Sequence, residues 1–363
     1  MDENSVSQEP KPTSAKSMAL KVVLPILIGL CVVVWLFHKE FSVELWKSIH
    51  FDHRVVLCIV LAWLFMAGRD FGLTWRFRTL TDRHLTWWQA LKVNFMCEFT
   101  SCVTPSAVGG SSLGMIFMHH EGINLGRATT LMFTTLFLDE LFFVVACPIV
   151  MLLIPYAELF GFKDTHFEVG LRWVFWIVYG AIFIWTTILF LGIIVKPNGI
   201  RSGLIFIFRL PFIRRWQPAV IALGDNMVSA SKDLRTRPVK WWAETFFATA
   251  LTWSSRFLVV NALFFGFVPT ADQLIVFGRQ FVVWVVLMVS PTPGGSGVSE
   301  WLFTEYYGDM LHNSGMALII ALFWRIITYY IYLLVGIFLA PSMLAPRKVS
   351  PDSETADKQK TNI

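Results

Sequence analysis

Charged residues are scarce in this 363-residue sequence: they make up 15% of it, against 55% for hydrophobic residues. Soluble domains are nearer a quarter charged, so this balance argues against an ordinary soluble protein. A helix needs about 20 mainly apolar residues to cross the hydrocarbon of a bilayer, and several stretches reach that length. The composition therefore predicts an all-α polytopic membrane protein.

Motifs for metal binding and for soluble catalysis are also missing. None of the five cysteines belongs to a CxxC pair, and the adjacent His119 and His120 lack the spacing of a metal site. No P-loop, GxSxG or HExxH motif occurs. These absences argue against ATP-driven pumping within the chain. We expect no metal or other cofactor, and we expect a protein that is not an enzyme.

Six apolar stretches are long enough to cross a bilayer. They cover residues 18–37, 55–75, 128–154, 171–195, 241–267 and 315–340. The first is too long for a signal-peptide core and has no small-residue cleavage site after it, so it is predicted to remain as a span. A single transmembrane domain over 18–345 is expected, between disordered tails at 1–17 and 346–363.

Two further apolar stretches, 91–118 and 274–303, are broken in the middle by proline and glycine. Proline removes a backbone donor, and glycine permits conformations that other residues avoid. Such backbone is tolerated at membrane depth only where protein or a wet cavity satisfies its polar groups. Each stretch is therefore predicted to be a re-entrant hairpin, with short helices starting again at Ser111 and Val298. The breaks contain Pro105, Gly109 and Gly110 in the first hairpin and Pro293, Gly294, Gly295 and Gly297 in the second.

The basic residues predict which side each loop faces. With a cytoplasmic N-terminus and a re-entrant first hairpin, the cytoplasmic segments carry 20 Lys and Arg residues and the opposite side carries 4. Cytoplasmic loops of membrane proteins carry this excess. If the first hairpin crossed instead, the loop 196–240, with nine basic residues, would face outward. The charges therefore favour cytoplasmic termini, in an inner membrane. Whether the second hairpin returns to its own side is tested by the charges of the C-terminal tail alone.

The chain also repeats internally. Arg69 precedes Pro105 by 36 residues and Arg256 precedes Pro293 by 37, while Gly110 to Glu140 and Gly295 to Arg325 are both 30 residues. Each of the segments 55–154 and 241–340 then contains a helix, a broken hairpin and a helix. Three predicted crossings separate the two starts, so the second copy is inverted. Inverted repeats with broken helices are typical of transporters.

Several charged residues fall within or beside the apolar spans, where charge is costly and usually functional. Two glutamates, Glu98 and Glu300, flank the breaks, and Glu140 is expected to pair with Arg325 across the repeat axis. Free N–H groups at the helix starts after the breaks, together with arginines, would form a site for an anion such as a lipid phosphate. For any one of these residues a purely structural ion pair is the alternative. The candidate charged residues are Arg69, Glu98, Asp139, Glu140, Arg256, Glu300 and Arg325.

The basic loop 196–240 contains the apolar run 204–208 followed by three arginines. A segment of this kind is predicted to lie on the membrane surface against anionic lipid. The positive charge is of the kind expected for a cytoplasmic loop, so we do not expect nucleic acid as a partner. A second copy of the chain or an enzyme of lipid synthesis remains a possible protein partner.

At this point the sequence resembles the lysylphosphatidylglycerol synthase transmembrane-region family, also called the flippase-like domain family. The resemblance covers roughly residues 20–340. In relatives such as the multiple peptide resistance factors, a similar domain moves aminoacylated phosphatidylglycerol between leaflets, and a separate soluble domain adds the amino acid. This chain has no room for that synthase domain, and its first break lacks an arginine that many members place there. The resembling segments are Thr104-Pro105 with Gly109-Gly110, Leu138-Asp139-Glu140, and the run SPTPGGSGVSE from Ser290 to Glu300.

The sequence therefore predicts a lipid translocase, either a flippase or a scramblase-like protein, that moves a phosphate-bearing lipid or lipid-linked headgroup between leaflets. The alternatives are an intramembrane enzyme or an accessory subunit of lipid or cell-envelope synthesis, and a regulatory membrane scaffold.

Overall fold

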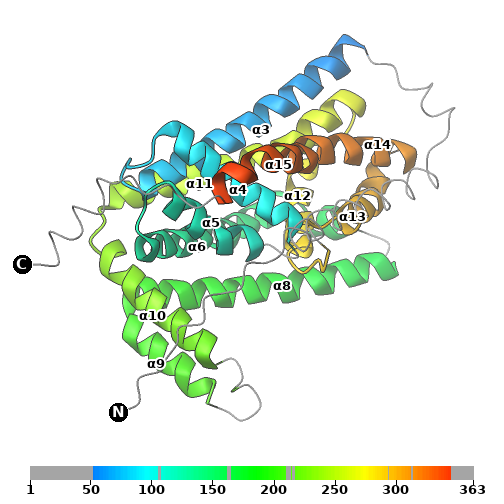
Figure 1. Ribbon diagram of the computed structural model, residues 1–363. Coiled ribbons are helices and arrows are strands. Elements are labelled where there is room, and N and C mark those ends of the chain that lie inside the picture. Colours follow the sequence, from blue (N-terminus) through cyan, green and yellow to red (C-terminus); the bar gives the residue numbers. More distant parts are fainter. Residues whose placement is uncertain are drawn as a thin grey trace, which may run out of the picture.

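The computed structural model describes residues 52–104, 108–161, 165–209, 214, 217–292, 294–311 and 314–344. These ranges contain helices and turns and no strand (Figure 1), which confirms the all-α class. Five of the six predicted spans are found as helices long and apolar enough to cross a membrane. The span predicted at 18–37 and both tails lie outside the described residues. The five helices are His53–Leu80, Leu125–Leu153, His166–Phe190, Val239–Phe267 and Gly315–Met343.

The two halves of the chain repeat the same order of helices. The first half consists of α3 (His53–Leu80), α4 (Trp87–Val103), α5 (Val108–His120) and α6 (Leu125–Leu153). The second consists of α11 (Val239–Phe267), α12 (Gln273–Leu287), α13 (Val298–Tyr307), the short 3-10 helix η3 (Gly308–Met310), and α14 (Ser314–Arg325), which continues through the π-helix η4 (Ile326–Tyr330) into α15 (Ile331–Leu344). The opening helices have 28 and 29 residues, and the hairpin helices have 17 and 13 in one half and 15 and 10 in the other.

Between the halves lie α7 (Tyr156–Phe160), the long α8 (His166–Phe190) with the π-helix η1 (Leu191–Val195), and two helices formed by the basic loop. These two helices, α9 (Pro197–Ile207) and α10 (Gln217–Leu234), extend from one end of the bundle (Figure 1). The loop 196–240 is therefore largely helical.

The opening helices of the two halves, α3 and α11, pack side by side and run antiparallel (Figure 1). At one end Arg54 of α3 donates to the backbone oxygen of Phe265, near the end of α11, at 2.7 Å. At the other end Trp241 of α11 donates to the backbone oxygen of Thr79, near the end of α3, at 3.2 Å. Equivalent helices that run in opposite directions are what an inverted repeat requires.

A glycine allows α3 and α11 to approach closely. A Cβ atom at Gly72 would lie 2.6 Å from the Thr252 hydroxyl and 3.0 Å from the backbone oxygen of Ala248. Four residues earlier, a Cβ atom at Gly68 would lie 3.3 Å from the Ser255 hydroxyl. Small residues spaced in this way are a common feature of helix interfaces in membranes, where close backbone packing replaces the hydrophobic effect.

Each broken hairpin leaves one end of the molecule and returns to the same end. In the first hairpin, Lys92 near the start of α4 pairs with Glu121, just after α5, at 2.5 Å. In the second, Arg279 near the start of α12 pairs with Asp309, just after α13, at 2.5 Å. A helix rises about 1.5 Å per residue, so none of the four hairpin helices is long enough to cross about 30 Å of hydrocarbon alone.

The two hairpins meet at their breaks. The backbone N–H of Gly294 donates to the backbone oxygen of Thr104 at 3.4 Å, and the Tyr329 hydroxyl of η4 donates to the backbone oxygen of Cys102 at 3.2 Å. The second short helix starts at Val298, as predicted. The first starts at Val108 and not at Ser111, so the prediction that Gly109 and Gly110 lie in the break is wrong: both lie in the first helical turn of α5.

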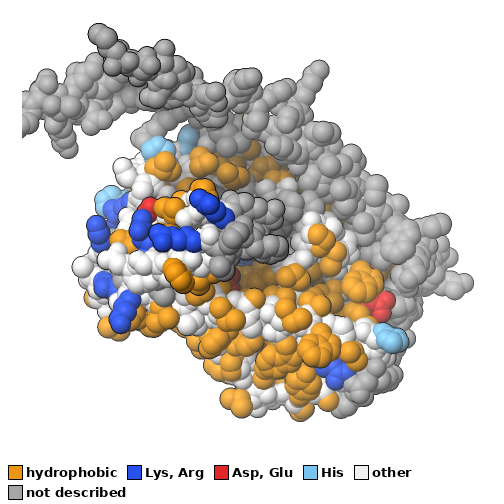
Figure 2. All heavy atoms as spheres, turned by 90° about the horizontal axis from the view of Figure 1, so that it is seen from below, with side chains coloured by type: hydrophobic (Ala, Val, Ile, Leu, Met, Phe, Trp, Pro, Cys, Tyr) orange, Lys and Arg blue, Asp and Glu red, His pale blue; other side chains and the backbone are white. Residues whose placement is uncertain are grey.

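Basic residues gather at one end of the bundle. The Asp82 carboxylate, just after α3, pairs both with Arg127 at the start of α6 and with Arg237 just before α11. On the face shown in Figure 2, most of the Lys and Arg side chains lie at one end, and many hydrophobic side chains are spread over the rest of the described surface. The loops that the charge count assigns to one side of the membrane thus include three that meet in space.

Candidate functional site

A cavity of about 230 Å³ lies between the two halves. It is lined by α3, α4 and α6 of the first half, and by α11, α12, α14, η4 and the second break of the other. The lining combines apolar side chains with charged ones. The charged residues that line it are Arg69, Arg76, Glu98, Asp139, Glu140, Arg256 and Arg325, six of which the sequence singled out.

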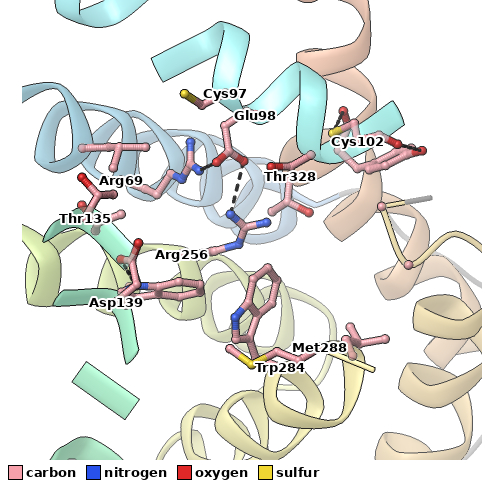
Figure 3. A pocket seen from close by; sticks show the side chains of 18 of the residues that line it. Arg69, Cys97, Glu98, Cys102, Thr135, Asp139, Arg256, Trp284, Met288 and Thr328 are labelled. Carbon is pink, nitrogen blue, oxygen red and sulfur yellow. Dashed lines mark hydrogen bonds and ion pairs between the residues drawn. The ribbon is translucent and has the colours of Figure 1, made fainter. Parts of the chain in front are cut away.

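One carboxylate in this cavity serves two arginines that occupy equivalent positions in the repeats. Glu98 of α4 pairs with Arg69 of α3 through one oxygen and with Arg256 of α11 through the other, the latter at 3.4 Å (Figure 3). Arg69 also pairs with Asp70 at 2.6 Å, and its side chain is only 2% exposed. Arg69 is therefore held firmly on two sides, whereas Arg256 has a single long ion pair among the residues that the structure describes.

The Arg256 guanidinium lies over an aromatic ring. Its central carbon is 4.4 Å from the centroid of Trp284 on α12 and 5.9 Å from that of Trp253. Figure 3 shows Arg256 between Glu98 on one side and Trp284 on the other. A guanidinium stacked on indole keeps its edge available for planar hydrogen bonding. Of the four cavity arginines, Arg256 is the one with no ion pair or hydrogen bond shorter than 3.4 Å among the described residues.

Arg76 was missed from the sequence. It lines the cavity and forms two hydrogen bonds to Asp139 of α6, at 2.6 and 3.1 Å, while Trp253 donates to the same carboxylate at 2.8 Å. The sequence placed Arg76 in a loop because the apolar run ends at residue 75. However, α3 continues to Leu80, and a spacing of seven residues puts Arg69 and Arg76 on one helix face. That spacing was the available signal.

Arg325 pairs with Glu300 and not with Glu140. The Arg325 Nε donates to Glu300 at 2.8 Å and Nη2 donates to Ser296 at 3.2 Å. Glu300, 1% exposed, also accepts from the backbone N–H of Gly297 at 2.7 Å and from the Ser299 hydroxyl at 2.8 Å. The predicted pair across the repeat axis is therefore wrong, because a carboxylate 25 residues away in the same half already neutralises this arginine.

Glu140 differs from the other carboxylates of the site. It lines the cavity beside Asp139, but its Oε2 atom is buried and has no hydrogen-bond partner among the described residues. Asp139 accepts three hydrogen bonds from Arg76 and Trp253. Two carboxylates adjacent in sequence thus have opposite surroundings, one fully paired and one not.

The glycines of the second break shape the floor of the cavity. Gly294 and Gly295 line it with φ of +57° and +70°, and Gly297 (φ +83°) donates to the Glu300 carboxylate just before α13. These are conformations that residues with a Cβ atom rarely adopt. Pro105 and Pro293, which were predicted to belong to the site, lie outside the described residues.

The cavity presents charged side chains of both signs within an apolar bundle, so it can bind a polar group there. Each of the four arginines of the site is already paired with a carboxylate, so the cavity is a network of ion pairs and not an open cluster of positive charge. A ligand anion would enter by replacing a weak internal pair. The weakest one in the geometry is Arg256 with Glu98.

Comparisons with known proteins agree with these features. Residues 22–336 match the family described as the lysylphosphatidylglycerol synthase TM region. A UPF0104 membrane protein of Archaeoglobus fulgidus is 22% identical over 329 residues, which is 86% of this chain and 94% of that protein. Because the family match covers most of the chain, including both breaks and every charged residue of the cavity, this protein belongs to the lysylphosphatidylglycerol synthase transmembrane-region family.

Proposed function

We propose that this protein is a lipid translocase that moves a phosphate-bearing lipid or lipid-linked headgroup between the leaflets of a cell inner membrane. The observation that carries the proposal is the cavity between the two halves, which is lined by arginine and tryptophan; the opening helices of these halves, α3 and α11, pack antiparallel. A headgroup crossing hydrocarbon needs a polar route, and charged groups within spans mark such routes.

Arg256 is the residue we assign to the phosphate. Within the described part of the chain it has one ion pair, at 3.4 Å, and its ring contacts leave the rest of the guanidinium without a hydrogen-bond partner there. Arginine binds phosphate through two parallel hydrogen bonds, which are stronger than a single long contact. Entry of a phosphate would therefore exchange Glu98 for the ligand at Arg256, while Arg69 retains its carboxylates.

In this proposal the two hairpins are re-entrant and enter the membrane from opposite sides. Their meeting point at Gly294 and Thr104 then lies near the bilayer midplane. The basic end of the bundle faces the cytoplasm, together with both termini, and the helices α9 and α10 lie against anionic lipid at that surface.

The test is a leaflet assay with the purified protein in phosphatidylcholine vesicles. Acyl-labelled fluorescent lipids with phosphodiester headgroups are compared with labelled diacylglycerol, which has no phosphate, and dithionite quenches the label in the outer leaflet. We expect accelerated movement of at least one phosphodiester lipid, and recovery of that lipid with its mass unchanged. A changed mass would support an intramembrane enzyme instead, and no movement above that of empty vesicles would favour an accessory or scaffold role.

A further inference from the structure

Glu140 is a carboxylate of the cavity to which the proposed function has so far assigned no role. Its buried Oε2 atom has no hydrogen-bond partner in the described part of the chain, although four arginines line the same cavity. Each of those arginines is bound to another carboxylate, and Asp139 next to Glu140 already accepts hydrogen bonds from Arg76 and Trp253. A carboxylate with an unpaired buried oxygen is stabilised when it binds a proton or a cation.

The formal charges around the cavity also favour a protonated Glu140 when a phosphate is bound. Four arginines face five carboxylates, because Asp70 and Glu300 lie directly behind the lining and pair with Arg69 and Arg325. The site therefore has a formal charge of −1 when every group is ionised. Binding of a phosphodiester would make the formal charge of the site −2, which is unfavourable at low dielectric. Protonation of Glu140 cancels the added charge.

We propose that Glu140 is the proton-binding group that couples movement of the phosphate headgroup to a proton gradient. As the phosphate reaches Arg256, the Glu140 carboxylate binds one proton and becomes a neutral carboxylic acid, and this O–H bond is the only covalent bond that forms or breaks. The proton is released on the opposite side, where the lipid leaves and the carboxylate is ionised again. This inference rests on the proposed function, and it adds the energy source.

The other charged side chains that share the cavity with Glu140 already form ion pairs. On the elements packed against α6, no charged residue of α5, α8, α10 or α12 lines the cavity in the described ranges. The charged side chains that share the cavity lie on α6 itself and on α3, α4, α11 and α14. They are Asp139, Arg69, Arg76, Glu98, Arg256 and Arg325, and each of them has an ion pair. Glu140 is thus the group among them whose protonation breaks no salt bridge.

The experiment measures the leaflet distribution of the labelled phosphodiester lipids in vesicles with and without an imposed pH difference of one unit. One proton per lipid makes each pH unit worth a tenfold change in distribution. The variant Glu140→Gln keeps the shape of the side chain and cannot titrate. Its matched control is Glu305→Gln, because Glu305 is exposed on α13 and does not line the cavity.

We expect up to a tenfold shift per pH unit for the unaltered protein and for Glu305→Gln, and no shift for Glu140→Gln. A second variant, Glu140→Asp, keeps a titratable group and is expected to retain the dependence, which separates titration from folding. Lipid movement in the unaltered protein that ignores the gradient, or a Glu140→Gln variant that still follows it, overturns the inference and leaves the proposed function intact. Absence of any lipid movement overturns the proposed function and the inference with it.

Discussion

Replacing Gly294 by alanine perturbs the point where the two hairpins touch. Gly294 has φ of +57°, and a Cβ atom there would lie 2.2 Å from Cε2 of Tyr329 and 3.1 Å from the backbone oxygen of Cys102. The ring belongs to a buried tyrosine that hydrogen-bonds to Ser296 and to Cys102, so moving it aside would break these contacts. The left-handed backbone costs about 1–2 kcal/mol for an alanine, and overpacking adds about 1–3 kcal/mol.

A neighbouring glycine provides the control for this substitution. Gly295 has a similar φ of +70°, but the nearest atom to its Cβ position is 3.7 Å away. Gly295→Ala should therefore cost only the backbone term, about 1–2 kcal/mol. We expect the free energy of unfolding, measured by detergent titration and tryptophan fluorescence, to fall further for Gly294→Ala than for Gly295→Ala. Equal losses in the two variants would refute the close contact between Tyr329 and the second break.

Three further substitutions test the packing and the ion pairs, each by the same unfolding titration. Gly72→Ala should separate α3 from α11 and cost about 1–3 kcal/mol. Its control, Gly180→Ala, should not destabilise, because no atom of the described neighbouring residues lies within 4 Å of its Cβ position. Equal effects of the two substitutions would contradict the close packing. Glu300→Gln leaves buried Arg325 without its partner and should cost about 3–5 kcal/mol, part of which a second change, Arg325→Met, should restore. Asp82→Ala breaks two partly exposed pairs and should cost no more than about 1 kcal/mol; a larger loss would show that these pairs hold the basic end together.

The spans and the breaks could be predicted because their signals are local. Length and apolar content identify a helix that can cross a membrane, and Pro and Gly mark where it stops. The spacing of Arg69 and Arg256 before the breaks indicated the repeat, and the structure places both arginines on the same carboxylate, Glu98. That meeting follows from the antiparallel packing of α3 and α11, which the sequence predicts only through its symmetry.

The pairing of charges could not be predicted, because it depends on which carboxylate lies nearest to each arginine in the folded protein. Arg325 and Glu140 occupy equivalent repeat positions, but Glu300 sits at the start of α13, where it also accepts from Gly297 and Ser299. The repeat symmetry does not reveal that competitor. The sequence analysis missed Arg76 for a different reason: the hydropathy falls at residue 75. The helix α3 nevertheless continues beyond this point, where hydrogen bonds from Trp75 and Thr79 to Glu244 stabilise it.

The central claim is that a lipid phosphate binds to Arg256 in the cavity between the halves. The most direct measurement is the initial rate of movement of the labelled phosphodiester lipid in vesicles that contain Arg256→Ala or Arg78→Ala. Arg78 provides a matched control because it also stacks on a tryptophan at 4.4 Å, Trp87, and does not line the cavity. A charge-assisted hydrogen bond is worth about 1.5–3 kcal/mol, so we expect Arg256→Ala to slow the lipid by roughly 10- to 100-fold, with Arg78→Ala close to the unaltered rate. Equal rates for the two variants would contradict the account.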